Sequence, residues 1–268
     1  MSYVSAKKSS GVFCLVFLMV FSAFARQEKP SRPFIIVSES IPPFEYMNNG
    51  EADGINIQLV KMVMSSLELD YEIRIASDVR ALELARQGKA DALLSVSWKP
   101  ERTEFLNYPE GFDGSGSPKN FMWASEYSFF APKGRASLMN IDGYADAASK
   151  GLKVGYIEGV SYAPAFWDAG LKLVPGTDDE SNFKKLLDGD IDIYIAEKNI
   201  ARAAIKKLGI KDKVAVIPKT LISKPYTMAF VKNSDIPDKD YWMRRFYEEL
   251  DRLKANGQAK RLYIKYLY

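Results

Sequence analysis

A helix, the motif Gly-x-x-Asp and a short apolar run follow one another twice in this chain. The first copy is ALELARQGKADALL at residues 81–94, and the second is FKKLLDGDIDIYIA at residues 183–196. Each copy predicts an amphipathic helix that ends near a glycine (Gly88 or Gly189) and leads into a buried strand. Polar residues follow each strand, and open α/β sheets bind ligands beyond the carboxyl ends of their strands. The repeat therefore predicts two α/β units that close on one small polar molecule.

The first 25 residues have the composition of a cleaved signal peptide. Lys7 and Lys8 form a positive segment, residues 11–22 are apolar, and residues 23–25 (Ala-Phe-Ala) have the small-x-small pattern of a cleavage site. A membrane anchor is the alternative, but the apolar run is shorter than the ~20 residues that a spanning helix needs. We therefore expect export to the periplasm, with residues 1–25 removed.

Composition argues against several kinds of chemistry. The chain has no histidine, and its one cysteine, Cys14, lies in the expected signal peptide. Histidine-dependent triads, disulfides, thiol chemistry and nearly all zinc or copper sites are therefore not expected, and we predict neither a metal nor a cofactor. With 37 Lys+Arg against 34 Asp+Glu, the charge balance does not favour nucleic acid as a partner. A monomer that binds a small molecule is expected.

Alternating strand and helix patterns predict a mostly parallel sheet in each half of the chain. Strands are predicted at 34–38, at 71–76, from residue 90, and at 152–157, 171–175, 191–196, 214–218 and 226–232. A helix is predicted from residue 55, and the Gly- and Ser-rich residues 109–120 predict a loop. A helical end at 238–267 is predicted to pack on the first half through one face that carries Trp242, Phe246, Leu250 and Leu253.

Two extended segments are expected to connect the halves. Residues 122–134 are aromatic and extended, and residues 226–232 predict a strand that returns to the first half. A chain that leaves one unit early and returns to it late has two hinge segments, as hinged closure requires. We therefore predict residues 26–130 plus 227–268 as lobe 1 and residues 131–226 as lobe 2.

The order of several motifs resembles the bacterial extracellular solute-binding proteins of family 3, the amino-acid-binding branch of the periplasmic binding proteins. The resemblance covers nearly the whole chain after the expected signal peptide. Its motifs are Pro42-Pro43-Phe44-Glu45-Tyr46, Gly54 before a helix, Gly88-x-x-Asp91, Ser95-x-Ser97-x-x-Pro100-Glu101-Arg102, Gly155 to Ser161, Gly189-x-x-Asp192 with Glu197, and Ala255-Asn256-Gly257. The resemblance implies an α/β protein with the type II periplasmic binding protein fold, in which two crossover hinge segments join two lobes.

Arg102 is the strongest ligand-binding candidate. Its guanidinium presents a rigid fork of donors that matches a carboxylate, and the resemblance implies that it holds the ligand α-carboxylate. A surface arginine paired with Glu101 or Glu104 is the alternative. Ser95 and Ser97 lie two residues apart on an extended segment, so their hydroxyls share a face and are further candidates. Satisfying local backbone groups is the alternative for both serines.

Ser161 and Glu197 are the candidates from the second half. Ser161 stands at the start of an expected helix at 161–168, where free N–H groups attract anions. The resemblance implies that it completes the carboxylate site, and simple capping is the alternative. Glu197 ends the second Gly-x-x-Asp strand, where the resemblance implies an acid that accepts the ligand ammonium. A solvated acid at a helix start is the alternative for Glu197.

Phe44 and Trp98 are aromatic candidates for the wall of the cleft, with burial in the core as the alternative for both. The sequence departs from the family nearby, because Asp78 and Val79 replace the aromatic residue often found before Arg80. Asp78 and Arg80 are therefore candidates for contact with a more polar ligand. A salt-bridged loop is the alternative.

The resemblance implies a periplasmic protein that captures a small amino-acid-like ligand by hinge closure and passes it to the membrane permease of an ABC transporter. We expect no enzymatic activity, because histidine is absent and the sequence marks no pair of carboxylates. Two other functions stay open. An enzyme on this scaffold, such as a dehydratase, would use carboxylates like Glu39, Asp78 or Glu197. A periplasmic sensor or signalling partner would act on a receptor.

Overall fold

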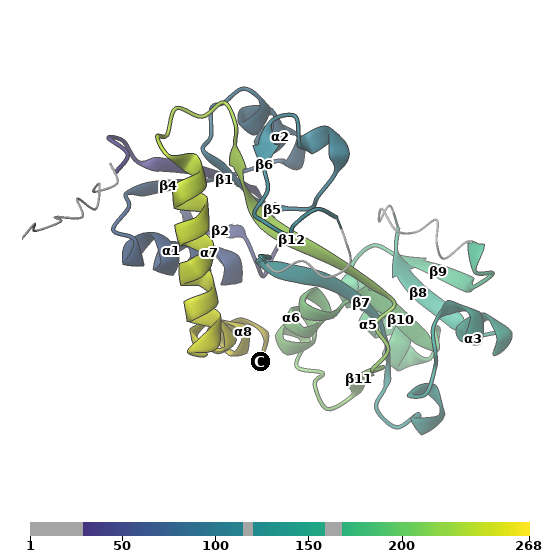
Figure 1. Cartoon of the computed structure of the whole chain (residues 1–268). Coiled ribbons are helices and arrows are strands. Elements are labelled where there is room, and N and C mark those ends of the chain that lie inside the picture. Colours follow the sequence, from purple (N-terminus) through teal and green to yellow (C-terminus); the bar gives the residue numbers. More distant parts are fainter. Residues whose placement is uncertain (1–28, 115–119, 159–167) are drawn as a thin grey trace, which may run out of the picture.

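The computed structural model describes residues 29–114, 120–158 and 168–268 (Figure 1). The expected signal peptide at residues 1–25 and the candidate Ser161 lie outside the described residues. Over most of the described length, strands alternate with helices, as predicted from the pattern of apolar residues.

The first part of the chain contains most of one sheet and the helices that cover it. Its elements are β1 (Phe34–Glu39), β2 (Tyr46–Asn48), β3 (Glu51–Asp53), α1 (Ile55–Ser66), β4 (Tyr71–Ala76), α2 (Asp78–Arg86), β5 (Ala92–Val96), the 3-10 helix η1 (Pro100–Arg102), β6 (Leu106–Asn107) and β7 (Trp123–Pro132). The predicted strands here are confirmed. Helix α2 begins earlier than predicted, because the side chain of Ser77 accepts a hydrogen bond from the N–H of Arg80 and caps the helix.

The second part of the chain contains the other strands and ends in two helices. Its elements are the 3-10 helix η2 (Ala136–Leu138), α3 (Tyr144–Ser149), β8 (Lys153–Ile157), β9 (Lys172–Gly176), α5 (Asp179–Asp188), β10 (Ile193–Glu197), α6 (Lys198–Leu208), β11 (Val214–Val216), β12 (Ile222–Val231), α7 (Lys239–Ala255) and α8 (Gln258–Leu267). The predicted strands are again confirmed, and β12 begins four residues before its predicted start at residue 226.

Two sheets share a pair of long antiparallel strands. The first sheet has the order β4-β1-β5-β12 and the second β7-β10-β8-β9, and both have parallel strands at their outer ends. Residues 222–226 of β12 pair with residues 123–127 of β7. Beyond this pairing β12 continues along β5, and β7 continues along β10. Each long strand therefore runs from one sheet into the other, as Figure 1 shows.

The first Gly-x-x-Asp motif joins β5 to β1 through its aspartate. The N–H of Asp91 donates to the carbonyl of Ile35, and the Asp91 carboxylate accepts from the N–H of Ile35, both at 2.7 Å. The same carboxylate, only 1% exposed, accepts from both terminal nitrogens of Arg32 and from the hydroxyl of Ser234. Asp91 therefore ties the segment before β1 and the segment after β12 to the first sheet.

The second motif repeats this arrangement between β10 and β8. The N–H of Asp192 donates to the carbonyl of Lys153, and the Asp192 carboxylate accepts from the N–H of Lys153 and from Arg135, all at 2.9 Å. Gly88 and Gly189, which open the two motifs, have positive φ angles of 68° and 83° that glycine adopts without a steric cost. In both sheets the repeated motif thus connects neighbouring parallel strands.

Helices α1 and α7 cover one face of the first sheet and enclose its main hydrophobic core. The face predicted for the C-terminal helical segment is confirmed by four buried side chains, those of Trp242, Phe246, Leu250 and Leu253. The predicted helical end at 238–267 is confirmed as two helices. The segment divides into α7 and α8 at Gly257, whose φ is 77°.

Helix α8 contacts helices on both sides of the molecule. It packs against α1 and α7, which cover the first sheet, and also against α6, which contacts β7 and β10 of the second sheet. The ammonium of Lys206 on α6 donates to the carbonyl of Lys265 at 2.9 Å, and the guanidinium of Arg202 lies 5.9 Å from the ring centroid of Tyr268. The sequence predicted that the C-terminal end packs on the first half. The structure shows that it contacts the second half as well.

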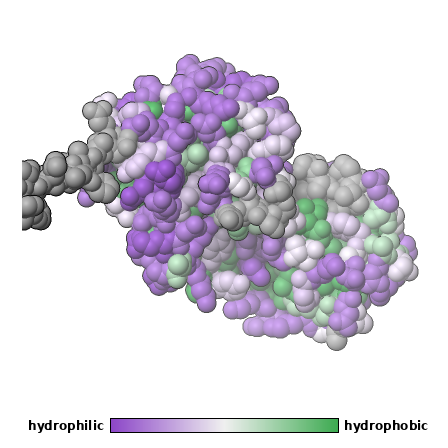
Figure 2. All heavy atoms as spheres, in the orientation of Figure 1, coloured by the Kyte–Doolittle hydropathy of each residue, from purple (hydrophilic) through white to green (hydrophobic). Residues whose placement is uncertain are grey.

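The molecule consists of two rounded masses that meet along a seam (Figure 2). On the face shown, hydrophilic side chains cover most of the upper mass, and hydrophobic side chains are more frequent on the lower one. Among the helices of the described residues, none combines the length and the apolar character that a membrane span requires.

Candidate functional site

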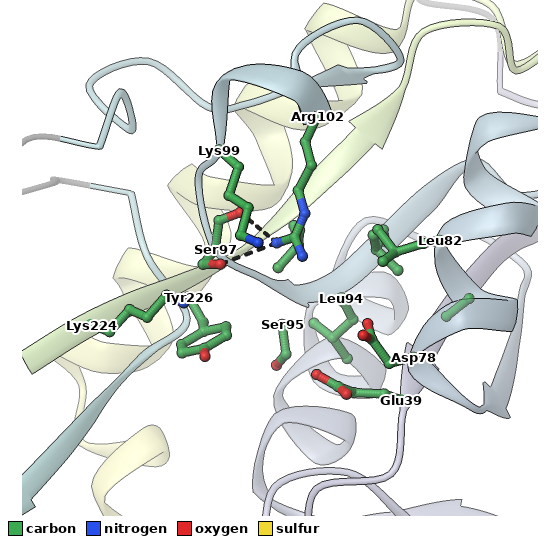
Figure 3. A pocket seen from close by; sticks show the side chains of 13 residues that line it. Glu39, Asp78, Leu82, Leu94, Ser95, Ser97, Lys99, Arg102, Lys224 and Tyr226 are labelled. Atoms are coloured by element: carbon green, nitrogen blue, oxygen red, sulfur yellow. Dashed lines mark hydrogen bonds between the residues drawn. The ribbon is translucent and has the colours of Figure 1, made fainter. Parts of the chain in front are cut away.

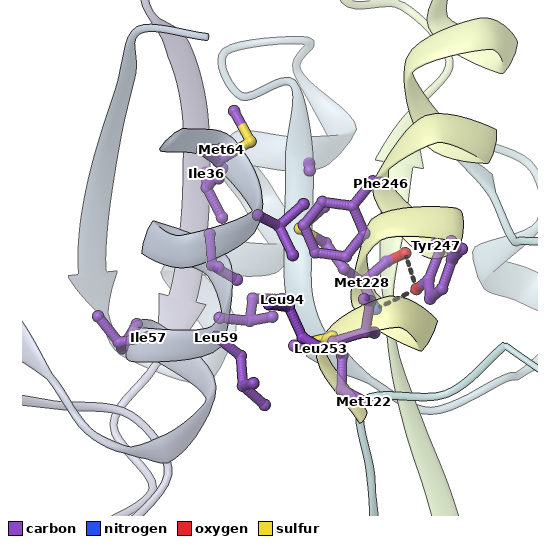
Figure 4. Close-up of a cluster of buried hydrophobic side chains, with 14 of the residues drawn as sticks. Ile36, Ile57, Leu59, Met64, Leu94, Met122, Met228, Phe246, Tyr247 and Leu253 are labelled. Atoms are coloured by element: carbon purple, nitrogen blue, oxygen red, sulfur yellow. Dashed lines mark hydrogen bonds between the residues drawn. The ribbon is translucent and has the colours of Figure 1, made fainter. Parts of the chain in front are cut away.

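A pocket of about 210 Å³ lies at the carboxyl ends of β1 and β5 (Figure 3). Its polar lining consists of Glu39, Asp78, Ser95, Ser97, Lys99, Arg102, Lys224 and Tyr226. Leu94 also lines it, and the Leu94 side chain reaches into the hydrophobic core between α1 and α7 (Figure 4). The pocket is smaller than the ~300–1,000 Å³ typical of sites for drug-sized ligands. Its size and lining therefore suit a small polar molecule.

Arg102 ends the short helix η1, which follows β5 and places the guanidinium over the pocket. Its Nη1 donates to the carbonyl (2.9 Å) and to the hydroxyl (3.1 Å) of Ser97. Glu101 and Glu104, the alternative partners, instead lie 3.9 Å from Lys99 and 3.8 Å from Arg86. Among the described residues Arg102 forms no ion pair, so its charge is positioned but not neutralised.

The two serines of β5 and its extension differ in what they offer a ligand. The Ser97 hydroxyl accepts from Arg102 and keeps its own proton available to a ligand. The Ser95 hydroxyl donates to the carboxylate of Glu45 and accepts from Asn56 (3.2 Å) and from Trp123 (3.0 Å). One proton and two lone pairs are the full capacity of a hydroxyl. Ser95 therefore lines the pocket with a side chain whose hydrogen bonds are all made within the protein.

Glu45 accepts a hydrogen bond from Ser95 of the pocket lining and is completely buried. Burial raises the pKa of its carboxyl from 4.5 to about 8, although hydrogen bonds from Ser95 and Asn56 oppose the shift. Its Oε2 has no hydrogen-bond partner among the described residues. Because an ionised buried carboxylate is costly without such partners, the protonated form is favoured at neutral pH.

Replacing Glu45 with glutamine is expected to make stability less dependent on pH. The folded protein keeps a proton on Glu45 up to a pH of about 8, whereas the unfolded chain loses it near 4.5, so unfolding releases a proton between these values. Stability therefore falls as pH rises through this window, by at most about 1.4 kcal/mol per pH unit for one proton. Urea unfolding should show Glu45→Gln becoming more stable relative to the native protein between pH 5 and pH 8. A stability difference that is constant over this range would contradict the prediction.

A stack of aromatic rings leads from the core to the pocket. Phe44 is fully buried and stacks on Trp123 with 3.9 Å between ring centroids, and Trp123 stacks on Tyr226 at 4.9 Å. Tyr226, and not Phe44, is therefore the aromatic residue at the pocket wall. Trp98 lines a different surface pocket that it shares with Tyr108 and Phe112. For Phe44 the structure agrees with the alternative of burial in the core.

Asp78 and Arg80 are separated, although they stand two residues apart. Asp78 is the first residue of α2 and lines the pocket together with Glu39. Burial raises the pKa of Glu39, the neighbouring Asp78 raises it further, and Arg102 lowers it. Arg80 is half exposed and pairs with Glu83 at 2.6 Å on the same helix. The alternative of a salt-bridged loop is thus wrong in one respect, because both residues belong to a helix.

Glu197 ends β10 and caps helix α6. Its carboxylate accepts from the N–H groups of Asn199 (2.8 Å), Ile200 (2.7 Å) and Glu126 (3.2 Å), and the side-chain amide of Asn199 approaches it at 3.4 Å. Burial raises its pKa to about 7. The alternative of an acid at a helix start is right about the helix and wrong about solvation, since Glu197 is buried. It does not line the pocket at Arg102.

Sequence reasoning missed three residues of this pocket. Lys99 lies between two predicted landmarks, Trp98 and Pro100, and carries no motif signal of its own. Lys224 and Tyr226 belong to β12 and reach the pocket because β12 pairs with β5. That pairing joins segments more than a hundred residues apart, and no local pattern indicates it. Among the described residues, no group of acidic or cysteine side chains is arranged to hold a metal ion.

Known proteins share both sequence and architecture with this chain. Residues 34–141 match the model of the family described as bacterial extracellular solute-binding proteins, family 3. The probable amino-acid-binding protein YxeM of Bacillus subtilis (strain 168) is 22% identical over 229 residues, which cover 84% of this chain and 79% of YxeM.

Solved structures of periplasmic binding protein type II domains have the same fold. The L-cystine solute receptor of Neisseria gonorrhoeae, unliganded and open, has a TM-score of 0.70 and 18% identity over 88% of this chain and 92% of that chain. Substrate-binding domain 2 of GlnP from Lactococcus lactis, also open, has a TM-score of 0.68 and 21% identity over 89% and 97% of the two chains. The predicted fold class is confirmed, and residues 34–141 are similar to the bacterial extracellular solute-binding proteins, family 3.

Proposed function

We propose that this protein captures a small amino-acid-like ligand in the pocket at Arg102. The observation that carries the proposal is the state of the guanidinium, which lines the pocket, is held by Ser97 and has no carboxylate partner among the described residues. A cation that is fixed in this way suits the carboxylate of a ligand. The family match and the amino-acid-binding relative support the same class of ligand.

Capture is completed when two lobes close about β7 and β12. Lobe 1 comprises residues 26–130 plus 227–268, and lobe 2 comprises residues 131–226. The polar lining of the pocket belongs to the first of these lobes and to β12. The second lobe therefore adds its contacts only when it closes, and contacts made only in the closed state shift the population towards it. Ser161 is the proposed second contact for the ligand carboxylate. Glu197 would accept the ligand ammonium in place of the side-chain amide of Asn199, which is its most distant donor.

The proposed setting is the periplasm, which the protein reaches as a monomer after loss of residues 1–25. The extracellular character of the family supports export. The closed, ligand-bound form is the state that a permease of an ABC transporter would recognise, and a membrane sensor is the alternative receiver of the same state.

Thermal unfolding in the presence of single L-amino acids tests the proposal. A true ligand at 100 times its Kd is expected to add about 2.7 kcal/mol to the free energy of unfolding and to raise the melting temperature. Isothermal titration then gives the Kd and the stoichiometry, which should be one. If no α-amino acid raises the melting temperature, the proposed ligand class is wrong.

One observation favours a second candidate, an enzyme on this scaffold. Glu39 and Asp78 bring two carboxylates to one pocket, and acid–base catalysis uses such groups. Recovery of the bound ligand distinguishes the two functions. A binding protein returns the ligand unchanged after long incubation, whereas an enzyme returns a product in amounts that exceed the protein.

A further inference from the structure

We infer that the ligand of this pocket carries two anionic groups and one cationic group, as an acidic α-amino acid does. The inference rests on the function proposed above and specifies its ligand class. It is based on the distribution of charged side chains over opposite walls of the pocket, which Figure 3 shows.

Three cations gather on one wall of the pocket. Arg102 and Lys99 come from the segment after β5, and Lys224 comes from the crossover strand β12. Lys224 forms no ion pair within the described residues, and its pKa is lowered by burial and by the charges of Lys99 and Arg102. Lys99 has one carboxylate near it, the exposed Glu101 at 3.9 Å. A single ligand carboxylate on Arg102 would leave the two lysines largely without a counter-charge.

Two carboxylates face the cations from the other wall. Glu39 ends β1 and Asp78 begins α2, and neither forms an ion pair among the described residues. Burial raises the pKa of Glu39 and the neighbouring Asp78 raises it further, so the ionised form of Glu39 is disfavoured by a like charge on the same wall. The ligand ammonium placed between them would relieve this repulsion, and its third N–H donor would stay available to Glu197 when the second lobe closes.

The balance of charges selects among amino acids. Among the described residues the lining holds three cations and two carboxylates, so a ligand with a net charge of −1 neutralises the pocket most completely. An acidic α-amino acid has this charge, and it carries an ammonium on its α-carbon and two carboxylates that can be distributed over Arg102, Lys99 and Lys224. A neutral amino acid leaves one cation without a partner, and a basic one adds positive charge to a positive wall.

Binding of matched ligand pairs tests this inference. L-glutamate and L-glutamine, like L-aspartate and L-asparagine, have nearly the same shape and differ by one negative charge. Titration calorimetry of the purified protein is expected to give at least a tenfold lower Kd for the acid than for the amide in one of the two pairs. Succinate, which lacks the ammonium of L-aspartate, is expected to bind at least tenfold more weakly than the preferred acidic amino acid.

Two charge-removing variants locate the preference on the protein. Lys224→Met and Lys99→Met are each expected to raise the Kd of the acid by a larger factor than the Kd of the amide, and so to bring the ratio of amide Kd to acid Kd towards one. Lys224→Arg should restore the preference. Lys133→Met is the matched control, since Lys133 is exposed and pairs with Asp212 outside the pocket. The control should keep the native ratio.

Failure of this inference differs from failure of the proposed function. If amides bind as tightly as acids, or if neither lysine variant changes the ratio, the inference is overturned while an amino-acid ligand remains. Succinate binding as tightly as L-aspartate would overturn the assignment of a cationic group to the wall of Glu39 and Asp78. If no α-amino acid binds at all, both the inference and the proposed function fall.

Discussion

Arg102→Ala is expected to weaken ligand binding by about 30-fold to 4,000-fold, the range that corresponds to the 2–5 kcal/mol lost when one partner of a buried charge pair is removed. Arg102 is the one arginine that lines the pocket in the part of the chain that the structure describes, and Ser97 holds its guanidinium through two hydrogen bonds. Its loss leaves the ligand carboxylate in a pocket without the rigid donor fork that matches it. The Kd measured by titration calorimetry for the amino acid that binds the native protein gives the result.

The fold is expected to tolerate this change. Arg102 forms no ion pair among the described residues, so within the protein the variant loses only the two hydrogen bonds from Nη1 to Ser97. Arg102→Lys keeps the charge but not the planar fork, and its Kd should fall between those of the native protein and the alanine variant. Arg80→Ala is the matched control, because Arg80 pairs with Glu83 on α2 and does not line the pocket.

A near-native Kd for Arg102→Ala would remove the central element of the proposed site. A large loss of melting temperature in the same variant would instead show that Arg102 has a structural role. The two outcomes are separate, because affinity is measured on folded protein and the melting temperature without ligand.

The regular elements of the fold were predictable because their signals are local. Helix α1 begins at Ile55 as predicted, since apolar residues at helical spacing follow a glycine directly. The C-terminal face was predictable for the same reason. The start of β12 was not, because Ser223, Lys224 and Pro225 break the apolar pattern on which the strand prediction relied. Those residues are held in the strand by pairing with β7.

The candidate site was predictable only where one motif contains several of its parts. Ser97 and Arg102 lie five residues apart and the structure joins them directly. The hydrogen-bond partners of the Ser95 hydroxyl are Glu45, Asn56 and Trp123, which lie 28 to 50 residues away along the chain. Sequence spacing cannot show that such distant groups use the whole capacity of one hydroxyl. Long-range packing therefore decides which of two similar serines is available to a ligand.

The aspartates of the repeated motif give the largest expected effect on stability. Asp91→Ala should lower the free energy of unfolding by about 3 kcal/mol or more, since removing one partner of a buried ion pair costs about 3–5 kcal/mol. The Asp91 carboxylate is 1% exposed and accepts from Arg32, Ile35 and Ser234. Arg32 is one-third exposed and also contacts Asp235, which places the expected loss at the lower end of that range.

Asp192→Ala provides the matched comparison, because the same motif holds the same backbone pair in the second sheet. Its carboxylate is 28% exposed and its partner Arg135 is 50% exposed, so both charges reach water when the pair is broken. The expected loss is about 1–2 kcal/mol, mainly from the unsatisfied N–H of Lys153. Urea unfolding of both variants, followed by circular dichroism, measures the two losses. The two motifs share their backbone geometry, so a larger loss of stability at Asp91 would be due to its burial. Equal losses would show that the shared geometry alone sets the contribution of each aspartate to stability.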